Sequence, residues 1–257
     1  MDQNRFETAI NRFKEYRDFV ERQENSIIRS WYGTDFNEVK SPKHPREDFY
    51  KQEIDKAFQR AKVRLFPESI PFKDKKEEER SKKDLRYNNS ADILETLIAF
   101  EGNLRDLRVL DIGCGSPILG NYLWSDFLPF VPEVLSELGA DVCGIDYRPN
   151  PFAGYRHIAM DLYDFDANKL KRNLPYEHFD LIFGSSLSGG TVTPRNGQFL
   201  KGIGLQLVTN VLGNIKPKNS LLSLDRNLCE VGMSSLELLG YTHFCSGSIN
   251  EFFISGY

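Results

Sequence analysis

Two stretches before residue 90 have apolar residues at every third or fourth position. The first stripe runs from Phe6 to Val20 and the second from Tyr50 to Leu65. This spacing places the apolar side chains on one face of a helix. The pattern therefore predicts two amphipathic helices, each with a face that must be buried against another part of the chain.

Polar sequence lies between and after these two stretches. The first polar segment, SPKHPRED, has two prolines and predicts a loop. The second, KDKKEEERSKKDLR at 73–86, alternates positive and negative charge. It predicts a solvated face or a linker, or else a lid or docking segment. The texture changes near residue 90. We therefore expect a helical segment over residues 1–88, with a possible role as a lid over an acceptor, and a separate domain over residues 89–257.

Beyond residue 90, apolar runs of strand length alternate with helix-like stretches. A capped helix is expected to begin at Asn89 or Ser90 and to end at Gly102. Seven strand candidates follow, of which the last two form a hairpin: LRVLDI (107–112), DVCGI (141–145), RHIAM (156–160), FDLIFG (179–184), SLLSL (220–224), YTHFC (241–245) and EFFIS (251–255). The alternation predicts an α/β fold with a seven-stranded, mostly parallel sheet and helices on both faces.

The strongest chemical signal is VLDIGCGSP at 109–117, where an apolar strand ends in Asp111 and is followed by Gly113, Gly115 and a helix start. Glycines at such a turn permit positive φ and let the backbone approach a ligand closely. The free N–H groups of the following helix attract a carboxylate or a phosphate. The segment therefore predicts a crevice for a nucleotide-type ligand.

Asp111 discriminates between two ligands that such a crevice commonly holds. An acid here would repel the pyrophosphate of a dinucleotide, whereas a ligand with an ammonium group would gain from it. S-adenosylmethionine carries both an ammonium and a sulfonium. At this point the sequence resembles the class I (Rossmann-like) S-adenosylmethionine-dependent methyltransferase family, whose first motif is an apolar pair, an acid, any residue, Gly, any residue and Gly. The resemblance covers roughly residues 86–257.

The resemblance implies a set of residues that contact S-adenosyl-L-methionine. Asp146 in GIDYRP would hold the ribose hydroxyls, and Asp161 in MDLYDF would face the adenine, with Leu162 as a backbone contact. Tyr87, just before the core, would reach the carboxylate of the cofactor, although a plain linker role fits it equally. The full set of expected cofactor contacts is Asp111, Gly113, Gly115, Ser116, Asp146, Asp161, Leu162, Ser185 and Tyr87.

The acceptor side has weaker signals. FDLIFGSSLSG resembles the family's fourth-strand motif, so Ser185 and Ser186 would line the cleft, and Asp225 with Arg226 follows the next strand. All four lie after strands, at the carboxyl edge where open α/β sheets bind ligands. Methyl transfer mainly requires alignment of the acceptor, and a general base is needed only when the acceptor atom is protonated. These four residues are therefore candidates for the catalytic side.

Two features depart from the family pattern. The third glycine is replaced by Ser116 and Pro117, a pair that suits the first turn of a helix but stiffens the approach to a ligand. Gly115 and Asp146 are 31 residues apart, whereas dinucleotide folds have about 20 between glycine and acid. The extra residues fall in 118–131, which is rich in aromatic residues and precedes a helix expected from Pro132 to Gly139. This insertion belongs either to the core or to a wall of the acceptor pocket.

Composition narrows the class of protein. The net charge is −4, divided as 21 Lys and Arg against 18 Asp and Glu (+3) over residues 1–90, and 12 against 19 (−7) over the remainder. A nucleic-acid enzyme more often has a clearly basic surface. No apolar run reaches the length of a membrane span and no signal peptide is visible, so we expect a cytoplasmic protein. The histidines are isolated and the four cysteines form no CxxC pair, so no metal site is expected.

These observations favour a methyltransferase that acts on a small molecule or a protein side chain. An inactive, cofactor-binding subunit is the main alternative, because fold alone does not fix function. An NAD-dependent oxidoreductase is disfavoured by Asp111 and by the lack of GxGxxG. The acceptor, the atom that is methylated and the oligomeric state are not defined by the sequence.

Overall fold

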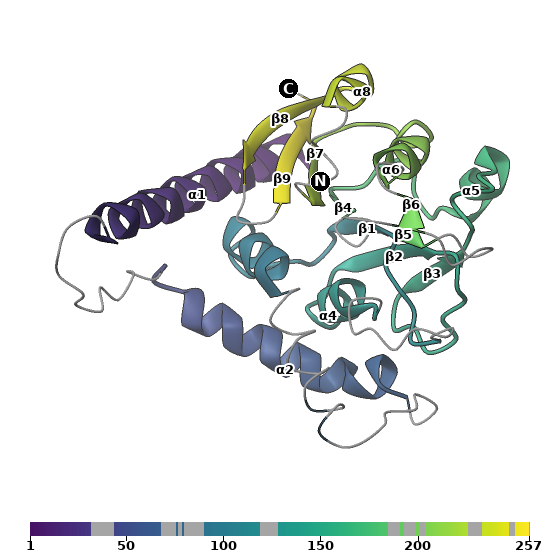
Figure 1. Cartoon of the computed structure of the whole chain (residues 1–257), viewed down its shortest axis with the longest axis horizontal. Coiled ribbons are helices and arrows are strands. Elements are labelled where there is room, and N and C mark those ends of the chain that lie inside the picture. The colour runs from purple at the N-terminus through teal and green to yellow at the C-terminus, as the bar shows by residue number, and fades with distance from the viewer. Residues whose placement is uncertain are drawn as a thin grey trace.

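A seven-stranded sheet forms the centre of the computed structural model, which describes residues 1–31, 44–67, 76, 79, 90–118, 128–184, 191–192, 199–200, 204–225, 233–246 and 250–256 (Figure 1). The strand order is β3-β2-β1-β4-β7-β9-β8. The strands are β1 (Arg108–Ile112), β2 (Asp141–Asp146), β3 (Arg156–Ala159), β4 (Leu181–Phe183), β7 (Ser220–Asp225), β8 (Tyr241–Ser246) and β9 (Asn250–Ser255). The first five are parallel, and the hairpin β8–β9 joins antiparallel to β7. The predicted Rossmann-like α/β fold is confirmed.

Alternation along each strand divides the sheet into two faces. In β1, Val109 packs into one apolar cluster, whereas Leu110 and Ile112 pack into another. Because side chains alternate along a strand, Asp111 lies on the same face as Val109. That face is covered by the helical segment 90–99, so the carboxylate of Asp111 lies on the side of the sheet that this segment covers.

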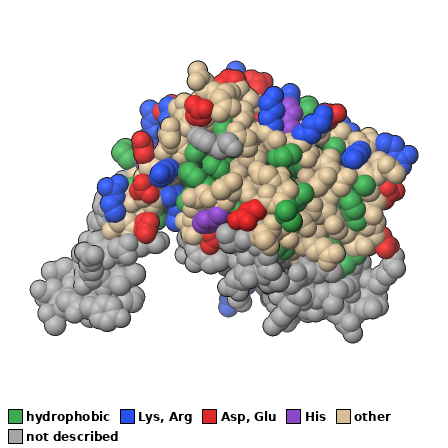
Figure 2. Space-filling view, turned by 90° about the horizontal axis from the view of Figure 1, so that it is seen from above, with side chains coloured by type: hydrophobic (Ala, Val, Ile, Leu, Met, Phe, Trp, Pro, Cys, Tyr) green, Lys and Arg blue, Asp and Glu red, His purple; other side chains and the backbone are tan. Residues whose placement is uncertain are grey.

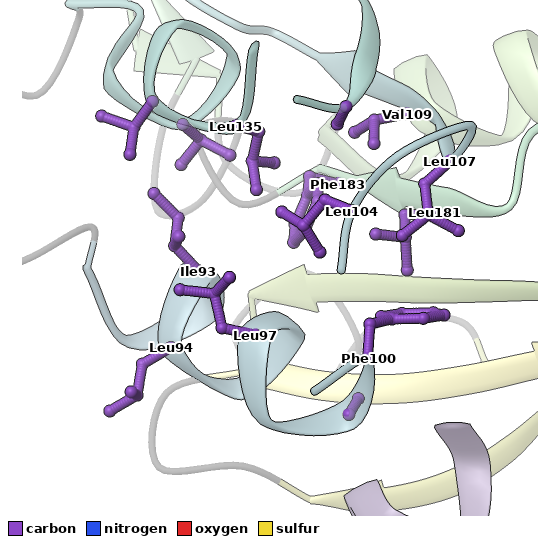
Figure 3. Packing of buried hydrophobic residues seen from close by; sticks show 14 of the residues in the cluster. Ile93, Leu94, Leu97, Phe100, Leu104, Leu107, Val109, Leu135, Leu181 and Phe183 are labelled. Carbon is purple, nitrogen blue, oxygen red and sulfur yellow. The ribbon is translucent and has the colours of Figure 1, made fainter. Parts of the chain in front are cut away.

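The first face is covered by α1 (Gln3–Trp31), the segment 90–99 and α4 (Phe130–Glu137), and α2 (Glu47–Leu65) packs against α4. In Figure 1, α1 lies beside β8 and β9, and α2 lies along α4. Figure 3 shows Ile93 and Leu97 on the side of the helical segment that faces Leu135, Leu104 and Phe183. Their side chains belong to one continuous cluster that also contains Phe6, Phe13, Tyr50, Ile54, Val109, Leu181 and Phe252.

The second face is covered by α5 (Ala167–Asn173), α6 (Gly204–Leu212) and α8 (Met233–Leu238). Asp166 caps α5, because its carboxylate accepts the backbone N–H groups of Asn168 and Lys169 at 2.9 and 3.0 Å. A separate two-stranded sheet consists of β5 (Thr191–Val192) and β6 (Phe199–Leu200). No sequence pattern predicted this small sheet.

The two predicted N-terminal helices are present and share a core with the sheet. The ring of Phe13 on α1 packs edge-on against Phe252 of β9, with centroids 4.6 Å apart. Arg17 forms a buried ion pair with Glu95 at 2.8 Å. Burial nevertheless raises the pKa of Glu95 to about 7, against the opposing effect of Arg17. The role of residues 1–88 as an acceptor lid stays a prediction.

The helix that follows the aromatic insertion differs slightly from expectation. α4 begins at Phe130 rather than at Pro132, which instead occupies its first turn, where proline loses no hydrogen bond. The helix ends before Gly139, whose φ of 97° terminates it as expected. Phe130 is buried in the core. Tyr122, Trp124 and Phe127 lie outside the described residues, so the acceptor-wall alternative stays a prediction.

Acidic and basic side chains are interspersed among the described residues on the face drawn in Figure 2. Hydrophobic side chains lie between them in small groups. Of the helices in the described part of the chain, none is long and apolar enough to cross a membrane.

Candidate functional site

A glycine turn follows β1 at the carboxyl edge of the sheet. Gly113 and Gly115 have φ values of 77° and 83°, in the left-handed region that favours glycine. The N–H groups of Gly113 and Cys114 both donate to the carbonyl oxygen of Ile145, at 2.8 and 3.0 Å. The turn is thereby anchored on the end of β2, at the carboxyl edge of the sheet where the sequence predicts a crevice between the ends of β1 and β2.

Asp111 forms the acidic floor of this crevice. Its side chain is 3% exposed, and it makes no hydrogen bond within the described part of the chain. Burial, together with the smaller effect of the nearby carboxylates of Asp92 and Asp146, raises the pKa of Asp111 to about 8. A buried carboxylate without a donor is costly. The crevice therefore favours a ligand that brings a positive group to Asp111.

Asp146 ends β2 and joins the two sides of the crevice. One carboxylate oxygen accepts the N–H of Gly115 at 3.1 Å. The other accepts the backbone N–H and the Nε–H of Arg148, at 3.0 and 3.2 Å. The carboxylate is thus fixed against the glycine turn, and the chain after β2 is held close to it.

Ser116 stands where the resemblance predicts a third glycine. Its hydroxyl donates to the carbonyl oxygen of Pro149 at 2.7 Å and accepts the N–H of Ile118 at 3.1 Å. A glycine could make neither side-chain bond. The departure at this position therefore has a local function, since Ser116 attaches the turn to the loop after β2.

Side chains of the edge strand β3 also connect the glycine turn to the loop after β2. The Nε2–H of His157 donates to the carbonyl oxygen of Arg148 at 2.8 Å, which leaves Nδ1 as an acceptor in the neutral ring. Nδ1 lies 3.5 Å from the hydroxyl of Tyr155 and 3.7 Å from the Sγ of Cys114. Burial raises the pKa of Cys114 well above its usual value, so it stays a neutral thiol.

Gly144 makes room for these side chains. A Cβ at Gly144 would lie 2.6 Å from the ring of Tyr155 and 2.7 Å from the Sγ of Cys114. Both distances are shorter than real contacts. The glycine in the middle of β2 is therefore required by the packing of the cluster formed by Cys114, Tyr155 and His157.

The remaining residues predicted for the cofactor or for the acceptor side lie along the same edge where the structure describes them. Asp161 follows β3, and its carboxylate accepts the N–H of Tyr163 at 2.9 Å, while Leu162 is buried. Asp225 ends β7, in register with Asn250 of β9, and its side chain is not described. Four predicted residues lie outside the described residues, namely Tyr87, Ser185, Ser186 and Arg226. The acceptor side of the crevice is therefore not tested.

Comparisons with known proteins give distant structural likeness. No family model matches the sequence, and no curated protein matches it. Among solved structures, the chain is similar to magnesium protoporphyrin IX methyltransferase from Synechocystis PCC 6803 with bound SAM, at 13% identity and a TM-score of 0.39, over 84% of this chain and 98% of that chain. It is also similar to a T. thermophilus 16S rRNA methyltransferase in complex with AdoMet and guanosine, at 14% identity and a TM-score of 0.34, over 86% of this chain and 45% of that chain. Because these scores are low, the function has to be argued from the crevice itself.

Sequence reasoning missed three contributors to the site. Asp92 lies on the helical segment 90–99, is 6% exposed and acts electrostatically on Asp111. Tyr155 and His157 were not expected near the glycine turn. The one available signal was position: His157 falls in a strand beside Gly144, its register partner. In the described part of the chain, no group of three or more His, Cys, Asp or Glu residues is placed so that it could hold a metal ion.

Proposed function

We propose that this chain binds S-adenosyl-L-methionine in the crevice at the ends of β1 and β2 and transfers its methyl group to a small molecule or a protein side chain. The observation that carries the proposal is Asp111, a buried carboxylate with no hydrogen-bond donor in the described part of the chain, placed at the start of a glycine turn. A ligand ammonium group would supply the missing positive charge.

The residues of the crevice fit this cofactor. Gly113 and Gly115 let the backbone approach the aminoacyl end, and Asp111 lies beneath it. Asp146, already fixed by Gly115 and Arg148, would bind the ribose hydroxyls. The bound cofactor supplies a methyl group on a sulfonium. The task of the protein is to hold the acceptor atom in line with that methyl and to exclude water.

A dinucleotide fits the same crevice poorly. Its pyrophosphate would lie on the glycine turn, close to the buried Asp111. Like charges in a low dielectric repel strongly, and the pyrophosphate could not neutralise this acid. Asp111, which favours an ammonium group, therefore disfavours NAD.

The acceptor side rests on weaker support. Asp225 ends β7 at the carboxyl edge, where ligands bind in open α/β sheets. Ser185, Ser186 and Arg226 are proposed for the same side on the family resemblance alone. Residues 91–257 carry a net charge of −7, from 12 basic and 19 acidic residues, which suits a polyanionic acceptor poorly.

Calorimetry with three ligands tests the proposal. S-adenosylmethionine and S-adenosylhomocysteine should bind to the full chain, and NAD should not. Asp146→Ala should weaken adenosyl-ligand binding by about 1.5–3 kcal/mol, the scale for hydrogen bonds to a charged group. Asp164→Ala, a nearby aspartate that the proposal does not use, is the matched control. NAD binding without a response to either adenosyl ligand would contradict the proposal.

A turnover screen separates the enzyme from an inactive subunit. The purified chain is incubated with a labelled methyl donor and with fractionated metabolites and proteins. Transfer of label to one fraction would establish methyltransferase activity and identify the acceptor class. Adenosyl-ligand binding without transfer to any fraction would instead favour a cofactor-binding subunit that serves a partner.

A further inference from the structure

A cavity of about 490 Å³ lies between α1 and α2, apart from the crevice. Its walls come from α1, the turn before α2, the start of α2 and the end of the helical segment 90–99. The volume is in the range of pockets that hold small molecules. None of the residues that line it is among those of the glycine turn.

The floor of this cavity is apolar and aromatic. Tyr16, Tyr50 and Ile98 all line it, and all three are buried. Burial raises the pKa of Tyr16 to about 12, so its phenol stays neutral. The ring of His44 meets Tyr16 edge-on, with centroids 5.7 Å apart. Such a floor suits the flat face of an aromatic ligand.

The rim of the cavity carries more positive than negative groups. Arg12, Arg22 and Arg46 line it together with Glu15 and Glu101. Arg12 is already paired with Glu101 at 3.0 Å. The remaining charged groups are two guanidinium groups and one carboxylate, which leaves a positive balance at the opening.

The two remaining arginines keep donors for a ligand. Arg22 uses its Nε–H to bond the carbonyl oxygen of Asp18 at 3.0 Å, and its terminal nitrogens stay available. Arg46 lines the same cavity as Tyr50, and the proximity of that phenol raises the pKa of the Arg46 guanidinium, which therefore stays charged. Guanidinium groups bind carboxylates and phosphates through paired N–H donors.

The cavity is separate from the proposed cofactor site. Ile98 lies six residues beyond Asp92 on the same helix, which corresponds to about 9 Å along the axis. Asp92 faces Asp111, whereas Ile98 and Glu101 face the cavity. The crevice and the cavity therefore lie on different sides of the helical segment 90–99, and a ligand in the cavity would not contact the crevice.

We propose that this cavity is a second binding site, which takes a small molecule with a flat aromatic body and an anionic head, either a carboxylate or a phosphate. The aromatic floor holds the body, and Arg22 and Arg46 bind the head. Binding does not require the cofactor, so the site stands or falls independently of methyl transfer.

The test uses phenylphosphate and benzoate as anionic probes and benzyl alcohol as the uncharged counterpart. Saturation-transfer NMR and a chemical-shift titration on the full chain are run at low salt, since exposed charges are screened at high salt. Both anions should bind, each at least about tenfold more tightly than benzyl alcohol, the scale for one charge-assisted hydrogen bond. A saturating concentration of S-adenosylhomocysteine should not displace them.

Three variants locate the probes. Arg22→Met should weaken phenylphosphate binding by about fivefold to tenfold without changing the melting temperature, because Arg22 is exposed. Arg46→Lys retains a positive charge and should weaken binding less than Arg46→Met. Arg172→Met is the matched control, because Arg172 is also exposed and its Nε–H also donates to the carbonyl four residues earlier in its helix.

The proposal is overturned by any of three results. The charged and uncharged probes could bind equally, Arg22→Met could leave the affinity unchanged, or S-adenosylhomocysteine could displace the probes. A chain that binds phenylphosphate as expected but no adenosyl ligand would retain this site and lose the proposed methyltransferase function.

Discussion

Two buried aspartates at opposite edges of the sheet have contrasting surroundings. Asp180, just before β4, is 0% exposed, and its carboxylate accepts the α-ammonium of Met1 at 2.6 Å and the N–H of Arg108 at 2.8 Å. Asp111, at the end of β1, is almost as buried and accepts no hydrogen bond in the described part of the chain. The same side chain thus has its donors supplied by the fold at one edge, and has none in the described part of the chain at the other.

A binding site can be recognised from such a contrast even where the fold and the family do not identify the ligand. Burial alone does not distinguish the two acids. What distinguishes them is whether the protein supplies the compensating donors. Asp180 is satisfied within the fold, whereas the described part of the chain supplies no donor to Asp111, and we propose that a ligand supplies the positive group. Substitutions at either acid, or at the residues that position them, therefore test this difference.

The largest effect is expected at the satisfied acid. Asp180→Ala removes the partner of a buried ammonium group and of a backbone N–H, so it should lower the free energy of unfolding by about 3–5 kcal/mol. The affinity for S-adenosylhomocysteine should stay unchanged in the folded fraction. Urea denaturation and calorimetry measure the two quantities. A loss of stability below about 1 kcal/mol, or a loss of affinity as large as that at Asp111, would remove the contrast.

The opposite result is expected at the unsatisfied acid. Asp111→Asn retains the shape but cannot ionise, so the ligand-free chain no longer has to take up a proton at this position in order to fold. Its free energy of unfolding should therefore rise by about 1–3 kcal/mol near pH 7.5. It should also weaken S-adenosylhomocysteine binding by about tenfold or more.

Asp106→Asn is the matched control for that substitution. Asp106 is exposed on the opposite edge with a φ of 65°, a conformation that asparagine tolerates. It should change neither stability nor affinity. If Asp111→Asn destabilised the ligand-free chain, Asp111 would be a structural acid like Asp180.

The pH dependence of stability should show the same contrast. The pKa of Asp111 is raised to about 8, and that of Glu95 to about 7, so the folded chain holds protons that the unfolded chain has already released. Their stabilising contribution is complete below about pH 4 and is lost as pH rises through 7 and 8. The unfolding free energy should therefore fall between pH 5 and pH 8, by at most about 1.4 kcal/mol per pH unit for each proton.

Denaturation at four pH values between 5 and 8 measures this slope. In Asp111→Asn the slope should be smaller, because one of the two protons is absent. A saturating ligand with an ammonium group should also reduce it, since the ionised form of Asp111 then has a partner. An identical slope in the wild type and in the variant would show that Asp111 titrates at its ordinary pKa.

Local pattern was sufficient to predict the framework of the fold. All seven strands of the main sheet and the two N-terminal helices follow from apolar periodicity, because each strand or helix buries a face that its own residues define. The turn at Gly113 and Gly115 was also predictable, since positive φ depends on the residue itself. The shared core of α1, α2 and the sheet was not, because an amphipathic face does not specify what it packs against.

The site was only half predictable for a related reason. Asp111 was predicted because an acid ends the strand before the glycine turn, and Asp146 because the family resemblance implies an acid at the end of the next strand. Tyr155 and His157 contribute through β3, and their closeness to Cys114 depends on register and on the missing side chain of Gly144. Neither feature is visible in the local sequence. Aromatic and histidine side chains in an edge strand are ordinary, so nothing marked this pair.

The smallest effect is expected at His157, which touches the crevice only through other residues. Its Nε2–H bonds the carbonyl of Arg148, the residue whose side chain holds Asp146, so it acts as a positioning residue. His157→Phe retains the ring but loses this donor, and should weaken S-adenosylhomocysteine binding by about 1 kcal/mol. His157→Gln places an amide N–H in a similar position and should recover most of the affinity. Melting temperatures separate this role from a packing role: equal affinity losses in both variants, or losses that follow the melting temperature, would show that His157 serves only the packing of β3.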